Sequence, residues 1–253
     1  MEADLTQLAD LVEGAPESGR GRAAPVPEAA LRAAEERVGP LPRSYRWWLG
    51  RFGRGTVGGA DIATVPPPHE DAAAEDLTAG WRREGARLCF CVEPGCGDGY
   101  SFALDRPGAG GEFRVVRRDA LDGDESPVAE SFAGFLAVRT ALALGLRDGP
   151  NPAVARLWRS TPGALLANGV LAYGPHLIGE RNETFEVGRY AADWVLVGDD
   201  GGGGGLFMRR HGRDRESVYR LGLGALGEDV ASEGELLTDD LVGWLEAGAP
   251  GAG

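Results

Sequence analysis

The first third of the chain carries apolar residues at helical spacing. A short amphipathic helix is predicted over residues 4–13, where leucine recurs at every third position. Residues 14–26, rich in glycine, alanine and proline, predict a linker. A second helix is expected over residues 27–38, because proline opens it and a Gly-Pro pair ends it. The clearest apolar stripe predicts a third helix over residues 42–52, and its members are Leu41, Tyr45, Trp48, Leu49 and Phe52.

Alternating apolar positions follow and predict a small antiparallel sheet. A glycine-rich turn at 53–59 leads to a short strand at 62–65, and residues 70–84 fit a solvated helix. A helix is predicted over residues 127–146. Turns rich in glycine, aspartate and proline separate three further strands, which we expect to pair in sequence as hairpins: 88–92, 100–104 and 113–117.

The second half of the chain has the same kind of pattern. Residues 152–159 predict a helix, and Thr238 is expected to cap a last helix. That last helix buries Leu241, Trp244 and Leu245. The glycine-rich tail at 248–253 is expected to be disordered. Between the two helices the pattern predicts strands at 170–173, 185–190, 194–197, 206–208 and 218–221.

Two stretches of the sequence look like divergent copies of each other. Residues 88–104 and 194–208 both consist of an apolar strand, an acidic and glycine-rich turn, and a second apolar strand. The correspondence continues with FRVV and SVYR, and then with FAGFL and LVGWL. We therefore predict an α+β fold of two small domains, residues 1–148 and 149–253, each an antiparallel sheet packed against helices.

The charge balance narrows the range of partners. There are 26 basic residues, all of them arginine, against 39 acidic ones, which gives a net charge of −13. Binding to nucleic acid requires a basic face, and an anionic membrane repels an acidic protein, so we expect neither partner. A cationic protein partner is favoured instead. The absence of lysine from the sequence indicates a GC-rich coding bias, hence a bacterial source.

The sequence shows neither a secretory signal nor a membrane span. Residues 2–13 are acidic, and the best apolar run, from Phe135 to Leu146, is interrupted by Arg139. The three cysteines are odd in number and close together, so they do not form a disulfide framework. We expect a cytoplasmic protein.

Support for catalysis or metal binding is poor. Cys89, Cys91 and Cys96 lack a nearby fourth ligand, and their C-x-C-x4-C spacing is not that of a zinc site. Cys89 and Cys91 are better explained as small buried residues of a strand. Neither a Gly-x-Ser-x-Gly elbow nor a His-Glu-x-x-His pair occurs in the sequence. We predict no catalytic residue, no metal and no cofactor, and rank an uncharacterised enzyme last.

Two places are candidates for binding a partner. Asp199 and Asp200 precede five glycines, so the turn either presents carboxylates to a cationic surface or is simply a flexible hairpin loop. A weak calcium site is a poorer alternative, because calcium needs six to eight oxygens. Trp47 lies about 200° from Tyr45 around its helix and is flanked by Arg51, a pairing found at binding hot spots. The alternative is that Trp47 packs on the sheet or on the second domain.

Residues 27–59 also resemble a known family. They contain a helix, a glycine followed by Leu41-Pro42, aromatic residues on the next helix, and a glycine-rich turn. This order resembles the hallmark of the SMI1/KNR4 (SUKH) superfamily, although Arg54-Gly55 stands where the family often has Asn-Gly. The chain from residue 169 onward looks like the divergent second half of two-domain bacterial members.

The resemblance implies an α+β fold to which no shared catalytic residues are attached. Many bacterial members are immunity proteins that bind and silence a polymorphic toxin encoded beside them, often a nuclease or a deaminase. Our first hypothesis is therefore a protein-binding module that neutralises a basic toxin domain. The alternative is a regulatory or scaffold protein of the same fold without a toxin partner. The oligomeric state is left open.

Overall fold

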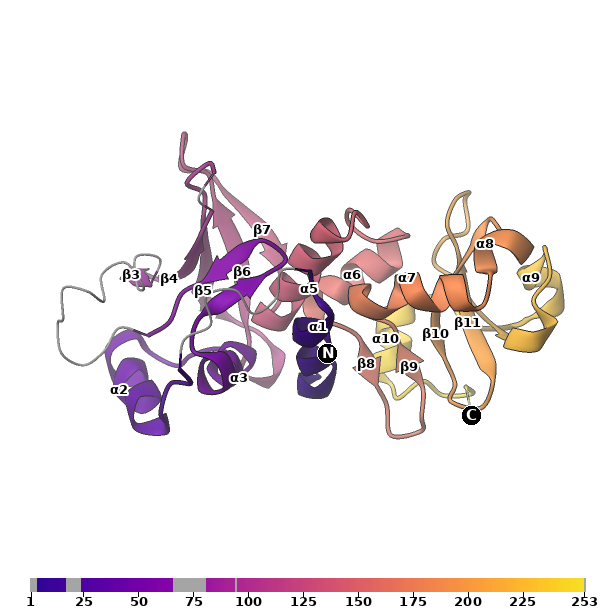
Figure 1. Ribbon diagram of the computed structural model, residues 1–253, viewed down its shortest axis with the longest axis horizontal. Helices are drawn as coiled ribbons and strands as arrows, with labels where there is room; N and C mark the ends of the chain where they lie inside the picture. Colours follow the sequence, from indigo (N-terminus) through magenta and orange to yellow (C-terminus); the bar gives the residue numbers. More distant parts are fainter. Residues whose placement is uncertain (1–3, 17–23, 66–80, 94, 253) are drawn as a thin grey trace.

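The chain folds into two antiparallel sheets, each packed against helices. The computed structural model describes residues 4–16, 24–65, 81–93 and 95–252. Its sheets have seven and six strands in the described residues, and the predicted α+β class is confirmed. Figure 1 shows the two sheets on either side of a group of helices along the long axis of the molecule.

The first sheet is a meander with a hairpin added at one end. Its strand order is β1-β2-β4-β5-β6-β7, and β3 also pairs with β4. Three helices precede it, close to the predicted ranges: α1 (Leu5–Gly14), α2 (Glu28–Val38) and α3 (Arg43–Phe52). The strands are β1 (Gly55–Val57), β2 (Ala60–Ile62), β3 (Arg82–Glu84), β4 (Arg87–Val92), β5 (Gly99–Pro107), β6 (Phe113–Arg118) and β7 (Glu125–Ala129).

An aromatic core joins this sheet to α3 and to α5 (Phe132–Ala143). The Tyr45 ring on α3 lies 5.0 Å from Phe132, and Phe90 stacks on Phe102 at 4.2 Å. All four side chains are fully buried. The β1–β2 hairpin approaches the backbone of α5 so closely that only glycine fits at Gly58, whose φ is also positive (54°).

The second sheet has the order β8-β9-β10-β11-β12-β13. Tryptophans 158 and 194 lie in its core. The elements of this half are α6 (Pro152–Ser160), β8 (Ala164–Leu165), β9 (Leu171–Ala172), α7 (Pro175–Thr184), α8 (Val187–Tyr190), β10 (Trp194–Asp199), β11 (Gly204–Arg209), β12 (Val218–Gly222), α9 (Val230–Glu233), β13 (Glu235–Thr238) and α10 (Leu241–Glu246).

The two halves share the same strand order, although β3 is added in the first half and α7 and α8 precede the meander in the second. In each, a helix leads to a two-stranded hairpin, then to a four-stranded meander, then to a closing helix, α5 or α10. Both closing helices are capped by a side chain that accepts the N–H of a glycine, Ser131 for Gly134 and Asp240 for Gly243. The repeat seen in the sequence is therefore present in the strand order. A boundary at residue 148 stays a prediction, because helices α1, α5, α6 and α7 pack together between the sheets (Figure 1).

Two predicted elements of the chain are wrong. The helix expected over 127–146 begins only at Phe132, because residues 125–129 form β7 and pair with β6. The strand expected at 185–190 is instead the end of α7 followed by α8. The physical reason is a long-range contact: the side-chain amide of Asn182 on α7 bonds to both the N–H and the C=O of Leu196, as a strand backbone would.

Three smaller predictions also change. The turn at 53–59 contains β1, and its partner strand ends at Ile62. Residues 82–84 form β3, whereas the rest of the helix expected at 70–84 lies mostly outside the described residues. The tail is ordered as far as it is described, because Ala249 and Ala252 are buried and the Trp244 indole donates to the C=O of Pro250.

Candidate protein-binding surface

The first sheet has a hollow on one of its faces. Leu88 and Phe102 point into the aromatic core, so their neighbours Cys89 and Ser101 point to the opposite face. There they line a cleft of about 740 Å³, which we call the sheet cleft. Its other walls come from β3, from the end of β6 and from the connection between β6 and β7.

The charges of the sheet cleft are largely paired. Arg87 lies 2.6 Å from Asp105 and 3.0 Å from Glu125, and Arg118 lies 3.1 Å from Glu84. Ion pairs that are this exposed contribute little stability, since water screens them. They do leave the cleft polar and nearly neutral, which suits contact with another protein surface better than capture of a small ion.

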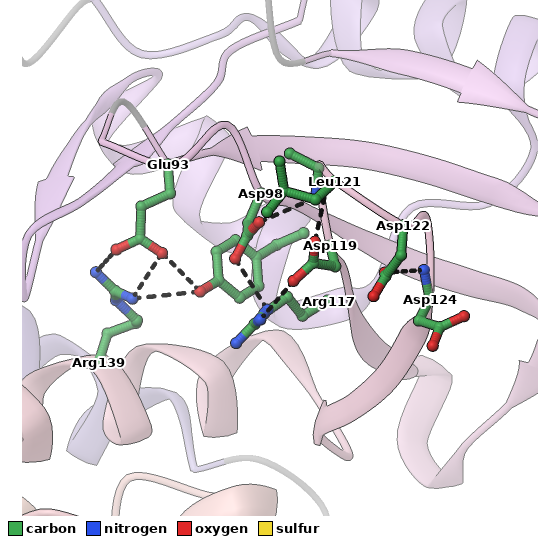
Figure 2. A network of polar contacts seen from close by, with 10 residues as sticks. Glu93, Asp98, Arg117, Asp119, Leu121, Asp122, Asp124 and Arg139 are labelled. Carbon is green, nitrogen blue, oxygen red and sulfur yellow. Dashed lines mark hydrogen bonds and ion pairs between the residues drawn. The ribbon is translucent and has the colours of Figure 1, made fainter.

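One wall of the cleft presents an exposed leucine. Leu121 is 97% exposed at the tip of the connection between β6 and β7 (residues 119–124, the Leu121 turn). Its N–H donates to the carboxylate of Asp119 at 2.8 Å, and the Asp124 N–H donates to Asp122 at 2.9 Å (Figure 2). Gly123 takes the positive φ (78°) that closes the turn.

The carboxylate of Asp98 holds the Leu121 turn in place. This carboxylate, only 7% exposed, accepts the Ala120 N–H at 3.1 Å and pairs with Arg117 at 3.0 Å. Arg117 in turn reaches Asp119 at 3.2 Å (Figure 2). The N–H of Leu121, with help from Arg117, holds the pKa of Asp119 below its ordinary value. A hydrophobic side chain is thus presented by a hydrogen-bonded turn that bears three aspartates.

A second polar group connects the sheet to α5. Arg139 on α5 lies 3.1 Å from Glu93, and the Tyr100 hydroxyl donates to the same carboxylate at 2.9 Å (Figure 2). Burial, reinforced by the bond to Glu93, raises the pKa of Tyr100 to about 12. Burial alone would raise the pKa of Glu93, but the bonds from Tyr100 and Arg139 outweigh it and lower that pKa. Arg139 is therefore fixed in position by an ionised partner.

The first pair of predicted binding residues lies on α3. Trp47 is half-buried, with its ring 5.7 Å from that of Phe52 in an edge-on arrangement. The Arg51 guanidinium lies 5.6 Å from the Trp47 ring and 3.4 Å from Glu13 on α1. Trp47 therefore packs against its own helix on one side and keeps part of its surface accessible.

The second predicted pair lies in the turn between β10 and β11. Asp200 accepts the N–H groups of Gly202 and Gly204, both at 2.8 Å. Asp199 accepts the N–H of Gly201 at 3.0 Å and the Tyr173 hydroxyl at 2.6 Å. Burial, together with the bond to Asp199, raises the pKa of Tyr173 far above its ordinary value. Both carboxylates thus organise the glycine turn, and Asp199 also ties it to Tyr173.

The predicted residues do not form one site with each other. Trp47 and Arg51 belong to the first half and Asp199 and Asp200 to the second, and no bond between the pairs occurs in the described part of the chain. Sequence analysis did not single out Leu121 or the aspartates around it. The available signal was the leucine itself, an apolar residue in the middle of a turn where polar residues prevail.

The three cysteines differ in exposure. Cys89 and Cys91 are buried free thiols, whereas Cys96 is exposed. Burial raises the pKa of Cys91 to about 12 and also raises that of Cys89, so both are protonated and poor nucleophiles. Within the residues that the structure describes, histidines, cysteines and acids nowhere gather in threes as a metal site would require.

Comparison with known proteins identifies the first half. Residues 25–138 match the SMI1 / KNR4 family (SUKH-1), a segment that runs from just before α2 into α5. The match over this segment confirms the resemblance found in the sequence. Comparison with curated proteins finds no match. The likeness of the second half to that of two-domain members stays a prediction. None of the helices in the described ranges has the length and apolar character needed to cross a bilayer.

Proposed function

We propose that this protein is a non-enzymatic binding module of the immunity type, which neutralises a basic toxin domain by covering it. The observation that carries the proposal is the Leu121 turn: a 97% exposed leucine on a hydrogen-bonded acidic turn at the rim of a cleft of about 740 Å³. The match of residues 25–138 to the SMI1/KNR4 family supports the same class of function.

Preorganisation is the physical reason for choosing this surface. Binding pays for every loop and side chain that must be ordered, and the bonds from Asp98 and Asp119 have already ordered this turn. A fully accessible apolar side chain on an ordered backbone can enter a partner's pocket with little further ordering of the loop. The surrounding aspartates at 119, 122 and 124 attract a basic surface and speed its approach.

A regulatory or scaffold protein of the same fold is the second candidate. It would use the same exposed turn, so only the partner distinguishes the two functions. Trp47 and Arg51 provide a further contact point, as do Asp199 and Asp200, and both pairs remain proposals. An enzymatic role has the least support, because the buried thiols are protonated and the fold carries no shared catalytic set.

The test is co-purification of the chain with the product of the neighbouring gene. Leu121→Asp should weaken that complex by about thirtyfold or more, the effect of losing a binding hot spot. The matched control is Leu165→Asp, which changes a half-exposed leucine on β8 in the other half and should leave binding unchanged.

The possible outcomes separate the candidates. If the neighbouring product is not toxic and forms no complex, the immunity proposal fails, and recovery of a housekeeping enzyme from the cell supports the regulatory one. If a complex forms and Leu121→Asp binds as well as the unchanged chain, the surface has been assigned wrongly.

A further inference from the structure

A second hollow, which we call the arginine pocket, lies where the two halves meet. Its volume is about 270 Å³, and its walls come from β5 to β7, from α5 and the loop after it, and from α6. Arginines line it from four places in the chain: Arg117, Arg139, Arg147 and Arg159. The only acidic side chain among its described lining residues is Asp148. This is an unusual concentration of positive charge in a chain whose net charge is −13.

Two of these arginines are positioned by carboxylates that do not line the pocket. Arg117 is paired with Asp98 and Asp119, and Arg139 is paired with Glu93 (Figure 2). A guanidinium has five N–H groups, and these pairs do not use all of them. The carboxylates thus hold the guanidiniums of Arg117 and Arg139 in place, and some N–H groups of these guanidiniums remain without a carboxylate partner.

The other two arginines have no such partner. The side chains of Arg147 and Arg159 form neither an ion pair nor a hydrogen bond with any residue in the described ranges. Arg147 also adopts a left-handed backbone (φ 53°), which costs energy for a residue other than glycine. Both residues are exposed, so water screens the repulsion between their charges, and both guanidiniums are accessible to an anion in the pocket.

We propose that the arginine pocket binds the phosphate group of a small molecule. Phosphate presents three oxygens in different directions, which suits arginines that approach from β6, α5, the following loop and α6. The rest of the wall is partly apolar, with Val128, Leu142 and Trp158, and accommodates a small group attached to the phosphate. The volume lies just below that of typical ligand sites, which limits the ligand to a compact one.

The test is calorimetric titration of the full chain with inorganic phosphate and with pyrophosphate, at constant ionic strength. Saturable binding is expected, tighter for pyrophosphate. The Arg147→Gln and Arg159→Gln substitutions should each weaken it about tenfold, the usual loss for one charge-assisted hydrogen bond. The matched control is the pair Arg213→Gln and Arg215→Gln, which should leave binding unchanged. Both arginines are exposed in the loop between β11 and β12 and have no ion pair with another described residue.

Three results would overturn the proposal. One is the absence of saturable binding to the unchanged chain. Another is an equal loss in the control pair, which would mean that only the overall charge matters. A third is tighter binding of glutarate than of pyrophosphate, which would make the site one for carboxylates. Thermal denaturation of each variant verifies that it is folded. The measurement uses no protein partner, so it stands or falls independently of the proposed function.

Discussion

The carboxylate of Glu112 accepts two hydrogen bonds from Ser44, one from its backbone N–H and one from its hydroxyl, both at 2.8 Å. The same hydroxyl oxygen accepts the N–H of Ala133 at 3.2 Å. Glu112, only 3% exposed, therefore satisfies an N–H in the first turn of α3, and the Ser44 hydroxyl satisfies one in the first turn of α5. Burial raises the pKa of Glu112 above its ordinary value, although the bonds from Ser44 oppose this shift.

Glu112→Ala should destabilise the protein by about 2–4 kcal/mol, because two buried donors of Ser44 lose their acceptor. The measurement is the free energy of unfolding from urea denaturation. Glu130→Ala is the control: this exposed residue pairs with Arg114, and its loss should cost less than about 1 kcal/mol. Equal losses of unfolding free energy in the two variants would show that the Ser44 bonds contribute no more than an exposed ion pair does.

Gly134 allows α5 and α6 to touch. A Cβ at this position would overlap the backbone carbonyl of Arg159, so Gly134→Ala must push the helices apart. We expect a loss of about 2–3 kcal/mol. Gly243 has the corresponding position in α10, where a Cβ would meet only the movable carboxylate of Asp240, so Gly243→Ala should cost about 1 kcal/mol. A comparison of the two urea midpoints decides the matter, and a larger loss for Gly243→Ala would contradict the prediction.

His176 should make stability depend on pH. Both nitrogens of its ring are buried without a partner, and burial lowers its pKa from 6.5 to about 4. The folded protein therefore binds fewer protons than the unfolded chain between these values, so stability should fall as the pH drops from 6.5 toward 4. His176→Phe should flatten that slope, whereas His211→Phe, at an exposed position, should not. Unfolding measured at several pH values provides the check.

The thiols should differ sharply in reactivity. Cys96 is exposed and should react quickly with a disulfide reagent in the native protein. Cys89 and Cys91 are buried and protonated, and they should react only after denaturation. Counting released chromophore with and without denaturant tests this, and three fast thiols in the native protein would contradict the burial described for β4.

Local pattern predicts those elements whose own residues carry the signal. Helix α3 and strands β4 to β6 have apolar faces at the right period, and their place in the sequence was found without a structure. The fourth strand of each half, β7 and β13, was missed because most of its residues are exposed and lack that alternation.

Long-range contacts explain what else the sequence did not show. Helix α7 is held by the bonds between Asn182 and Leu196. These two residues belong to different elements, so the pattern of neither segment alone reveals the contact. The Leu121 turn is held by Asp98, which lies in the connection between β4 and β5. The arginine pocket gathers residues from β5 to α6, and only folding brings them together.

Helix α5 covers the core of the first sheet and also packs against α6 and α7 from the second half. Dividing the chain between α5 and α6 would expose, on each piece, the apolar surface that the other half covers. We therefore expect neither piece to be soluble by itself and the two halves to fold as a single unit.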